Sequence, residues 1–416
     1  MRLILLLAAA LALLPSAAGA QSAPPAVVQQ ARETVTILIS LDGFRPDYIT
    51  AERTPNLKAA ADAGVFAAMR PSFPTMTFPN HYTLVTGLRP DRHGIVDNNI
   101  EDPAKPGVRF EPSAPKVTRD RFWWDQAEPI WVSAEKENIR TGTMFWPGSD
   151  SDIRGQRPRL WWAYDAAITS RQRTDTVLDW LRRPADRPRF VTLYFDVVDK
   201  ASHSQGLYSA ELDEAVRALD VEVGYLRGAL AAMGQPANLV IVSDHGMAAV
   251  PPAQQMKPAD LIDETLMRTI VAGPMVYIWP NPGSEAAAEA RVLKPHPHAQ
   301  CWRKEALPAR FHYGRNARVA PLLCMSETGW RYNAWAEKTY VMGDHGFDNQ
   351  DPQMRALFIA VGPAFSAGRT LPVFDNVDVY PLLRRLIGLP AASDIDGSDA
   401  VFAPVLARRS HAALRQ

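Results

Sequence analysis

The chain has 416 residues, of which 47% are hydrophobic and 22% are charged, and its formal net charge at pH 7 is zero. This size allows a large buried core, in one large α/β domain with insertions or in two or three smaller domains. The balanced charge argues against a groove for long nucleic acids, but a metal site could still supply local charge for a small anionic substrate.

The first residues have the pattern of a secretory signal peptide. Arg2 precedes an apolar run over 3–14 that is too short to span a bilayer comfortably, and residues 18–20 (Ala-Gly-Ala) have the form of a cleavage site. We therefore expect a signal peptide over 1–20, with an uncleaved anchor as the alternative, and a flexible leader over 21–33. Since no later apolar run is long enough for a membrane helix, we expect an exported chain, periplasmic or secreted, without a membrane span.

Short apolar runs rich in β-branched residues predict buried strands of a parallel sheet. These runs cover 35–40, 190–195, 238–243 and 356–361. Helices are predicted between them, at 54–64, 80–86, 209–233 and 377–389. This alternation indicates an α/β fold: an open, mostly parallel central sheet with helices on both faces and ligands beyond the carboxyl ends of the strands. We expect the domain to span 34–404 and a basic tail to follow over 405–416.

Two stretches break this alternation and are expected to be irregular insertions, at about 89–164 and 247–341. The first is rich in proline, glycine and aromatic residues. We expect it to hold a helix at 130–136 and a strand at 141–145 and to form one wall of a pocket, although most of its aromatic side chains should be ordinary packing. The second contains the only two cysteines, Cys301 and Cys324, which can pair in an oxidising compartment; the alternative is two separate thiols.

A proline-rich loop over 71–82 carries two candidate nucleophiles, Thr75 and Thr77. The sequence from Asn80 to Thr86 is compatible with a helix, so a threonine just before it would lie near a helix N-terminus, where free N–H groups favour an anion. That position suits a hydroxyl that attacks phosphorus, and the structural alternative is an N-cap threonine on a surface turn. The residues alone do not choose between the two hydroxyls.

Aspartate and histidine residues recur at strand exits and glycine turns, without any thiolate among them. Carboxylate and imidazole ligands suit zinc, with manganese or iron as weaker candidates. Two metal ions with three or four protein ligands each would account for the full set, and such a pair can hold the attacking and leaving oxygens of a phosphoryl transfer. The candidate ligands are Asp42, Asp199, His203, Asp244, His245 and His345, together with Thr77.

These residues belong to a longer ordered pattern. It consists of Asp42, Pro74-Thr75-x-Thr77-Phe78-Pro79-Asn80-His81-Tyr82, His93-Gly94-Ile95-x-x-Asn98, Trp146-Pro147-Gly148-Ser149, Asp199-x-x-x-His203, Ser243-Asp244-His245-Gly246-Met247 and His345-Gly346-Phe347-Asp348-Asn349. The pattern resembles the nucleotide pyrophosphatase/phosphodiesterase family within the alkaline phosphatase superfamily, and most of all its single-domain bacterial members. The resemblance covers about residues 34–390 and implies an alkaline-phosphatase-like fold and a zinc-dependent hydrolase.

The resemblance also implies a role for each ligand. One zinc ion would be held by Asp199, His203 and His345, and the second by Asp42, Asp244, His245 and Thr77. Thr77 would then be the nucleophile and would form a covalent phosphothreonine intermediate. His81 and His93 also lie within the motifs, but we expect both to support loops rather than to bind metal.

Substrate contacts follow from the same resemblance. Asn98 would donate to a non-bridging phosphate oxygen, helped by the backbone N–H of Thr77 or Phe78. Phe78 and Tyr164 would stack on a nucleobase. The chain departs from the family where Val198-Asp199-Lys200-Ala201-Ser202-His203 replaces the usual Pro-Asp-x-x-Gly-His: both ligands are retained, but the turn residues differ. Lys200 also adds a positive charge beside Asp199, and we expect it to disturb the fine geometry of that site.

The expected activity is cleavage of phosphodiester or phosphoanhydride bonds in small nucleotides, with release of a nucleoside 5′-monophosphate. One alternative is a phosphodiesterase that acts on lipid or choline head groups. A phosphomonoesterase is another, although the serine nucleophile and nearby arginine of alkaline phosphatases are not found at Thr77. A non-catalytic metal-binding protein is disfavoured because the ligand set and Thr77 are complete.

Overall fold

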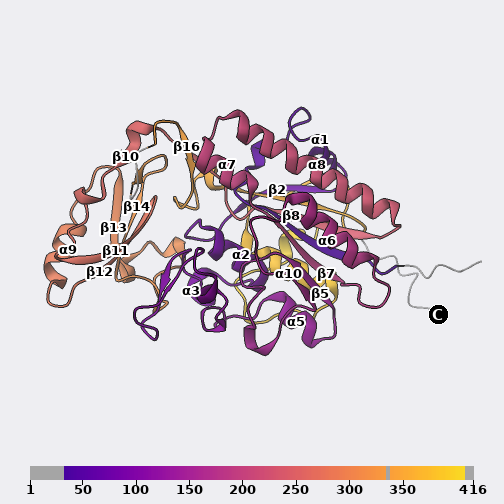
Figure 1. Cartoon of the computed structure of the whole chain (residues 1–416), viewed down its shortest axis with the longest axis horizontal. Coiled ribbons are helices and arrows are strands. Elements are labelled where there is room, and N and C mark those ends of the chain that lie inside the picture. The colour runs from indigo at the N-terminus through magenta and orange to yellow at the C-terminus, as the bar shows by residue number, and fades with distance from the viewer. Residues whose placement is uncertain (1–31, 334–337, 408–416) are drawn as a thin grey trace, which may run out of the picture. The chain divides into compact units, whose positions relative to one another are not determined.

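The computed structural model describes residues 32–333 and 338–407. The expected signal peptide, nearly all of the leader and residues 408–416 of the expected tail lie outside these ranges. Within the described residues, the main element is a nine-stranded sheet (Figure 1). Its order is β18 (Arg369–Thr370), β2 (Val65–Arg70), β17 (Ala356–Val361), β8 (Ala237–Val242), β1 (Val35–Leu41), β7 (Phe190–Phe195), β5 (Thr141–Met144) and β6 (Leu160–Trp161), and β19 (Phe374–Asp375) also pairs with β2.

The sheet is mostly parallel, as the sequence predicts. Strands β8, β1, β7, β5 and β6 all run in the same direction. Strand β17 is the exception, because it pairs antiparallel with both β8 and β2. Since β2 and β8 both oppose β17, they share one direction. The carboxyl ends of β2, β8, β1 and β7 therefore lie along the same edge of the sheet.

Helices cover both faces of the sheet, and the alternation of side chains along β1 shows how. Ile37 and Ile39 pack in a core with α1 (Pro55–Asp62), α6 (Ser170–Arg182) and α8 (Ala210–Ala232). Leu38 packs on the other face with α2 (Thr77–Thr86), α5 (Ile130–Lys136) and α10 (Val379–Ile387). Every residue of β1 is buried, which explains why five of its seven residues are apolar and none is charged.

Helix α8 matches its predicted boundaries to within one residue. The Ser209 hydroxyl caps it by accepting from the Leu212 N–H at 3.1 Å. All the apolar residues at alternating four- and three-residue spacing are buried, so the stripe that predicts the helix is also the face that packs on the sheet: Leu212, Val216, Leu219, Val223, Leu226 and Leu230.

The first predicted insertion is only partly an insertion. Its helix α5 and its strands β5 and β6 belong to the main sheet and its covering layer. The remainder holds α3 (Pro90–His93), the short hairpin of β3 (Ile100–Glu101) and β4 (Arg109–Phe110), and α4 (Pro115–Thr118). Trp123, Trp124, Trp131 and Trp146 are buried, so most of the aromatic side chains are packing, as expected.

The second predicted insertion is not irregular, and this expectation is wrong. It forms an antiparallel sheet in the order β11 (Met267–Ala272), β12 (Met275–Pro280), β14 (Leu322–Ser326) and β13 (Ala299–Arg303), on which α9 (Glu285–Val292) packs. The β11–β12 hairpin turns on Gly273 and Pro274, and Gly273 has a φ of 66°, which glycine adopts without strain. Cys301 pairs with Cys324 across β13 and β14 and forms the predicted disulfide.

Two further strand pairs lead from the small sheet back towards the main one. Strand β10 (Gln255–Met256) pairs with β15 (Arg331–Tyr332), and β9 (Ala248–Val250) pairs antiparallel with β16 (Met342–Asp344). At the other end, hydrogen bonding continues to Ala407, whose N–H donates to the Ala364 carbonyl at 2.8 Å. The packed chain therefore extends slightly past Pro404.

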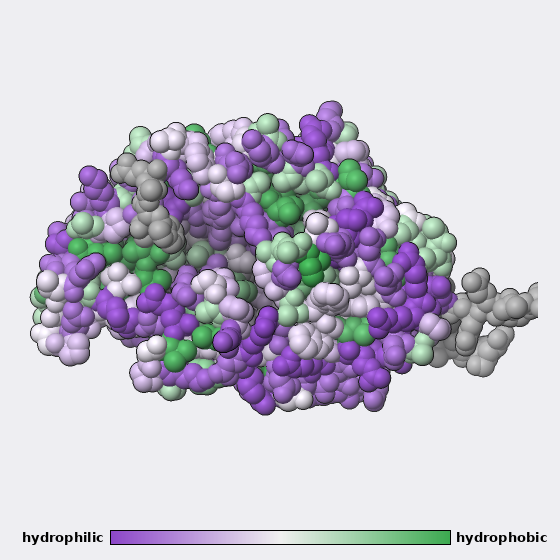
Figure 2. Space-filling model, viewed as in Figure 1, coloured by the Kyte–Doolittle hydropathy of each residue, from purple (hydrophilic) through white to green (hydrophobic). Residues whose placement is uncertain are grey.

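Figure 2 shows that hydrophilic residues cover most of the viewed face, with hydrophobic residues in small separate groups. Across the described residues, no helix has both the length and the apolar character needed for a membrane crossing.

Candidate metal centre and substrate cavity

The candidate ligands come together because their strands are neighbours. Asp42 directly follows β1, and Asp244 and His245 follow β8. Asp199 lies in the first turn of α7 (Val197–Gln205), which begins just after β7. Strands β8, β1 and β7 are adjacent and parallel, so their carboxyl ends deliver these side chains to one edge of the sheet.

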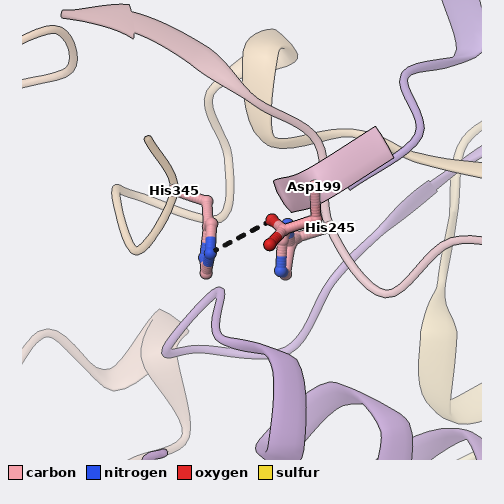
Figure 3. Close-up of side chains that lie close together, drawn as sticks. All are labelled: Asp199, His245 and His345. Atoms are coloured by element: carbon pink, nitrogen blue, oxygen red, sulfur yellow. Dashed lines mark ion pairs between the residues drawn. The ribbon is translucent and has the colours of Figure 1, made fainter. Parts of the chain in front are cut away.

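Two groups of side chains each converge on a point. One ligand atom from each of Asp42, Asp244 and His245 lies within 4.8 Å of the others, and the same is true of Asp199, His245 and His345. Figure 3 shows the Asp199 carboxylate directed at His345, whose Nε2 lies 3.6 Å from Asp199 Oδ1. His203 completes the cluster, because its Nε2 lies 3.3 Å from the same oxygen. All six predicted Asp/His residues are thus brought together.

The two buried histidines present the nitrogen that a metal ion requires. His245 donates through Nδ1 to the Gly246 carbonyl at 2.9 Å, and His345 donates through Nδ1 to the Thr75 carbonyl at 2.9 Å. A backbone carbonyl only accepts, so in both neutral rings Nδ1 carries the proton and Nε2 has a free lone pair. Both Nε2 atoms face the carboxylates of the cluster.

The carboxylates of the cluster are buried close together, where a cation would stabilise their charged forms. Burial raises the pKa of Asp42 well above its usual value, and the neighbouring carboxylates of Asp244 and Asp199 raise it further. Burial also opposes ionisation of Asp244, yet the adjacent imidazoles of His245 and His81 outweigh burial and lower the pKa of Asp244 to about 2. Within the described residues, Asp42 Oδ1, Asp199 Oδ1 and Asp244 Oδ2 are buried without a hydrogen bond. Carboxylate oxygens that lack hydrogen-bond partners and converge with imidazole nitrogens are a donor set that fits divalent metal ions.

The structure distinguishes the two threonine hydroxyls. The Thr75 hydroxyl donates to the Phe347 carbonyl at 2.9 Å and accepts from the Gly346 N–H at 3.0 Å, so it is fully occupied in holding a loop. The Thr77 hydroxyl lies 3.4 Å from His245 Nε2 and lines a cavity beside the cluster. Thr77 is also the first residue of α2, so it lies at the helix N-terminus, as predicted.

Asn98 is placed beside the same helix N-terminus. Its Oδ1 accepts from the Phe78 N–H at 2.8 Å, which leaves the Asn98 NH₂ group as the available donor. The Phe78 N–H is therefore already used. Among the described residues the Thr77 N–H has no acceptor, so of the two backbone donors suggested by the sequence, Thr77 is the available one.

A cavity of about 240 Å³ opens next to the cluster. Thr77, Asn98, Asp42 and Asp199 lie at its metal-binding end. The remaining wall includes seven aromatic side chains, among them both predicted stacking residues: Phe78, Trp124, Phe145, Trp146, Trp162, Tyr164 and Tyr194. The Tyr164 hydroxyl hydrogen-bonds the carboxylate of Asp196, which fixes the orientation of its ring.

Sequence reasoning missed Tyr194, whose hydroxyl donates to Asp42 Oδ2 at 2.6 Å. The only available signal was its place near the end of a strand that leads to Asp199. His81 supports the site, as predicted: Nδ1 donates to the Thr77 carbonyl at 2.9 Å, and Nε2 lies 2.8 Å from the Ser40 hydroxyl. His93 is buried and lies 3.0 Å from the Thr83 hydroxyl, which also agrees with a structural role.

A mixed α/β sheet that gathers this cluster at one edge, next to a threonine at a helix N-terminus, agrees with the resemblance to the alkaline phosphatase superfamily. Comparison with known proteins identifies the family to which the chain belongs. The family described as type I phosphodiesterase / nucleotide pyrophosphatase matches residues 36–348. The chain belongs to this family, whose members are phosphodiester and pyrophosphate hydrolases.

Individual relatives agree with this family. An uncharacterized pyrophosphatase/phosphodiesterase of Schizosaccharomyces pombe is 37% identical over 384 residues, covering 86% of this chain and 78% of that protein. The bis(5′-adenosyl)-triphosphatase enpp4 of Xenopus laevis is 35% identical, covering 85% and 77%. The chain also spans 41% of the longer ectonucleotide pyrophosphatase/phosphodiesterase family member 1 of mouse, at 34% identity.

A solved structure agrees as well. Murine ectonucleotide pyrophosphatase/phosphodiesterase 5, as an inactive threonine-to-alanine variant in complex with AMP, is similar with a TM-score of 0.85 at 29% identity. The match covers 90% of this chain and 100% of that structure.

Proposed function

We propose that this chain is a zinc-dependent nucleotide pyrophosphatase/phosphodiesterase that cleaves small nucleotides and releases a nucleoside 5′-monophosphate. The observation that carries the proposal is the position of the Thr77 hydroxyl. It lies at a helix N-terminus, 3.4 Å from His245 Nε2, between the Asp/His cluster and an aromatic cavity. A hydroxyl in this position can reach a phosphate held at the cluster while the rest of the substrate fills the cavity.

We assign Asp199, His203 and His345 to one zinc ion, and Asp42, Asp244, His245 and Thr77 to the other. When bound, the two ions would act as Lewis acids that lower the pKa of the Thr77 hydroxyl and neutralise charge on the phosphate. The proximity of the Asp42, Asp244 and His245 ligand atoms supports the second set. The first set is supported by Asp199 Oδ1, which has no hydrogen bond and lies 3.3 Å from His203 Nε2 and 3.6 Å from His345 Nε2.

The protein groups then have separate roles. The Thr77 oxygen attacks phosphorus in line with the leaving group, the bond from phosphorus to that group breaks, and the nucleoside 5′-phosphoryl group becomes esterified to Thr77 as a phosphothreonine diester. In a second step water attacks phosphorus, the bond to Thr77 breaks, and nucleoside 5′-monophosphate is released. The Asn98 NH₂ group and the Thr77 N–H stabilise the non-bridging oxygen in the transition state. Phe78 and Tyr164 bind the base. Two relatives support a nucleotide substrate, because one is named as a bis(5′-adenosyl)-triphosphatase and the other is solved with AMP.

A second candidate substrate is a choline-containing diester. The cavity wall includes Trp124, Trp146 and Trp162, and the faces of indole rings attract quaternary ammonium groups. The phosphoryl chemistry at Thr77 would be the same, so only the group held in the cavity would differ.

We further propose that the chain works in an oxidising compartment outside the cytoplasm. The Cys301–Cys324 disulfide supports this, because such bonds persist where thiols are not kept reduced.

The test compares Thr77→Ala with Thr75→Ala on a nucleotide diester such as para-nitrophenyl thymidine monophosphate. Loss of the nucleophile should reduce kcat by about a thousandfold or more. Thr75→Ala removes two loop hydrogen bonds, together about 1 to 2 kcal/mol, so it should reduce activity by no more than about 30-fold. Metal analysis of both variants should find about two zinc ions per chain. An active Thr77→Ala enzyme, or a zinc-free active wild type, would contradict the proposal.

A further inference from the structure

Lys200 directly follows Asp199, an expected zinc ligand, but its ammonium group contacts other residues. From α7, its Nζ contacts Asp196 Oδ2 at 2.6 Å and the Tyr164 hydroxyl at 3.0 Å. The same Nζ lies 5.7 Å from the centre of the Tyr164 ring, and Lys200 lines the substrate cavity. Lys200 is therefore part of the cavity wall, next to the ring proposed to bind the base.

Asp196 is the residue that holds this arrangement in place. Its carboxylate is almost fully buried and binds the Tyr164 hydroxyl, Lys200 and, through Oδ1, Arg173 Nη1 at 3.1 Å. Arg173 is itself buried and is fixed by the carbonyls of Ile168 and Tyr194. Since each partner is held by the others, Lys200 and the Tyr164 ring have little freedom to move apart.

The charge balance at this wall is positive. Lys200 and Arg173 each contribute one positive charge, and Arg173 lies 5.8 Å from the Tyr164 ring centre, whereas Asp196 alone opposes them. Among the other acidic residues that line the cavity, Asp150 is paired with Arg119 at 2.8 Å, and Asp42 and Asp199 belong to the metal cluster. A cation stacked on Tyr164 would meet this excess positive charge, but an uncharged planar ring would not.

We propose that Lys200 is a specificity-determining residue: held beside Tyr164 by Asp196, it disfavours cationic head groups in the cavity and leaves the aromatic wall to uncharged bases. This proposal rests on the proposed function, because it decides between the two candidate substrates. Lys200 occupies one of the two unspecified positions of the Pro-Asp-x-x-Gly-His pattern, so the effect is a property of this chain and not of the metal chemistry shared by the family.

The experiment measures kcat/KM for para-nitrophenyl thymidine monophosphate and para-nitrophenyl phosphorylcholine. The ratio of the two values is the readout, because any disturbance of Asp199 slows both reactions and cancels. In Lys200→Met the preference for the thymidine substrate should fall about fivefold or more, since a like charge has been removed from the wall. In Lys200→Arg, which keeps the charge, the ratio should stay within about twofold of wild type.

Lys58→Met is the matched control, because Lys58 also pairs with an aspartate four residues away on a helix, at 2.6 Å, but does not line the cavity. Its ratio should equal that of wild type. An unchanged ratio in Lys200→Met, or an equal change in Lys200→Arg, overturns this inference while the proposed function stands. A wild-type enzyme that cleaves neither substrate overturns both.

Discussion

Replacing Tyr194 with phenylalanine should weaken metal binding without removing any ligand. The Tyr194 hydroxyl donates to Asp42 Oδ2 at 2.6 Å inside the protein, and the other oxygen of Asp42 has no hydrogen bond. A hydrogen bond to a charged group contributes about 1.5 to 3 kcal/mol. If the whole loss falls on the metal-bound state, zinc affinity at the proposed Asp42 site should fall about 10- to 100-fold. Competition with a chromophoric chelator measures this affinity directly.

Tyr48→Phe provides the control for this measurement. Tyr48 is also buried, but among the described residues its hydroxyl has no hydrogen-bond partner. Removing it deletes a polar group that burial penalises, so zinc affinity should be unchanged and stability equal or higher. If Tyr194→Phe binds zinc within twofold of wild type, the hydrogen bond does not orient Asp42, and the reasoning about this ligand is wrong.

Burial raises the pKa of Asp97 from 3.8 to about 6, although the Tyr277 hydroxyl donates to it. The folded state therefore holds this proton more tightly than the unfolded state, and stability falls as pH rises from about 4 to 6, by at most about 3 kcal/mol. Urea unfolding of Asp97→Asn should lose less stability than wild type between pH 5 and pH 7, and equal losses would contradict this. A Cys301→Ala/Cys324→Ala double variant should lose about 3 kcal/mol on the chain-entropy model, because the disulfide closes a separation of 23 residues. Unfolding curves identical to those of the wild type would exclude that contribution.

Local sequence patterns predicted the elements in which the apolar side chains are buried along the whole length of the element. The buried strand β1 and the apolar stripe of α8 are both of this kind. The same patterns could not give the direction of β17, because the direction of a strand is set by its neighbours and not by its own residues. The small sheet of β11 to β14 was missed because β11 and β13 mix buried and exposed side chains instead of forming apolar runs, and because proline and glycine lie between the strands.

For the site, the residue types could be predicted from the sequence, but their hydrogen-bond and ion-pair partners could be identified only in the structure. The six Asp/His residues could be named because each follows a strand or a glycine turn. Lys200 was expected to disturb the geometry around Asp199, but its charge is paired with Asp196. That pairing joins the end of β7 to the residue four positions later in α7, and Tyr164 joins it from 32 residues earlier in the chain. The i,i+4 spacing of Asp196 and Lys200 can be read within one segment, but no local pattern reveals the contact with Tyr164.

Thr75 explains how a ligand from the end of the chain reaches a site built by the sheet. Three parallel strands deliver Asp42, Asp199 and Asp244, but His345 follows β16, which is not in the main sheet. The pairing of β16 with β9 brings it close, and Thr75 fixes it: the carbonyl of Thr75 accepts from His345 Nδ1, and its hydroxyl binds residues 346 and 347. Thr75 is two residues from Thr77, so the loop that positions the proposed nucleophile also orients the last ligand. The sequence does not distinguish the two hydroxyls, because both belong to threonines of the same loop. In the structure the Thr75 hydroxyl holds the loop, and the Thr77 hydroxyl faces the proposed phosphate site.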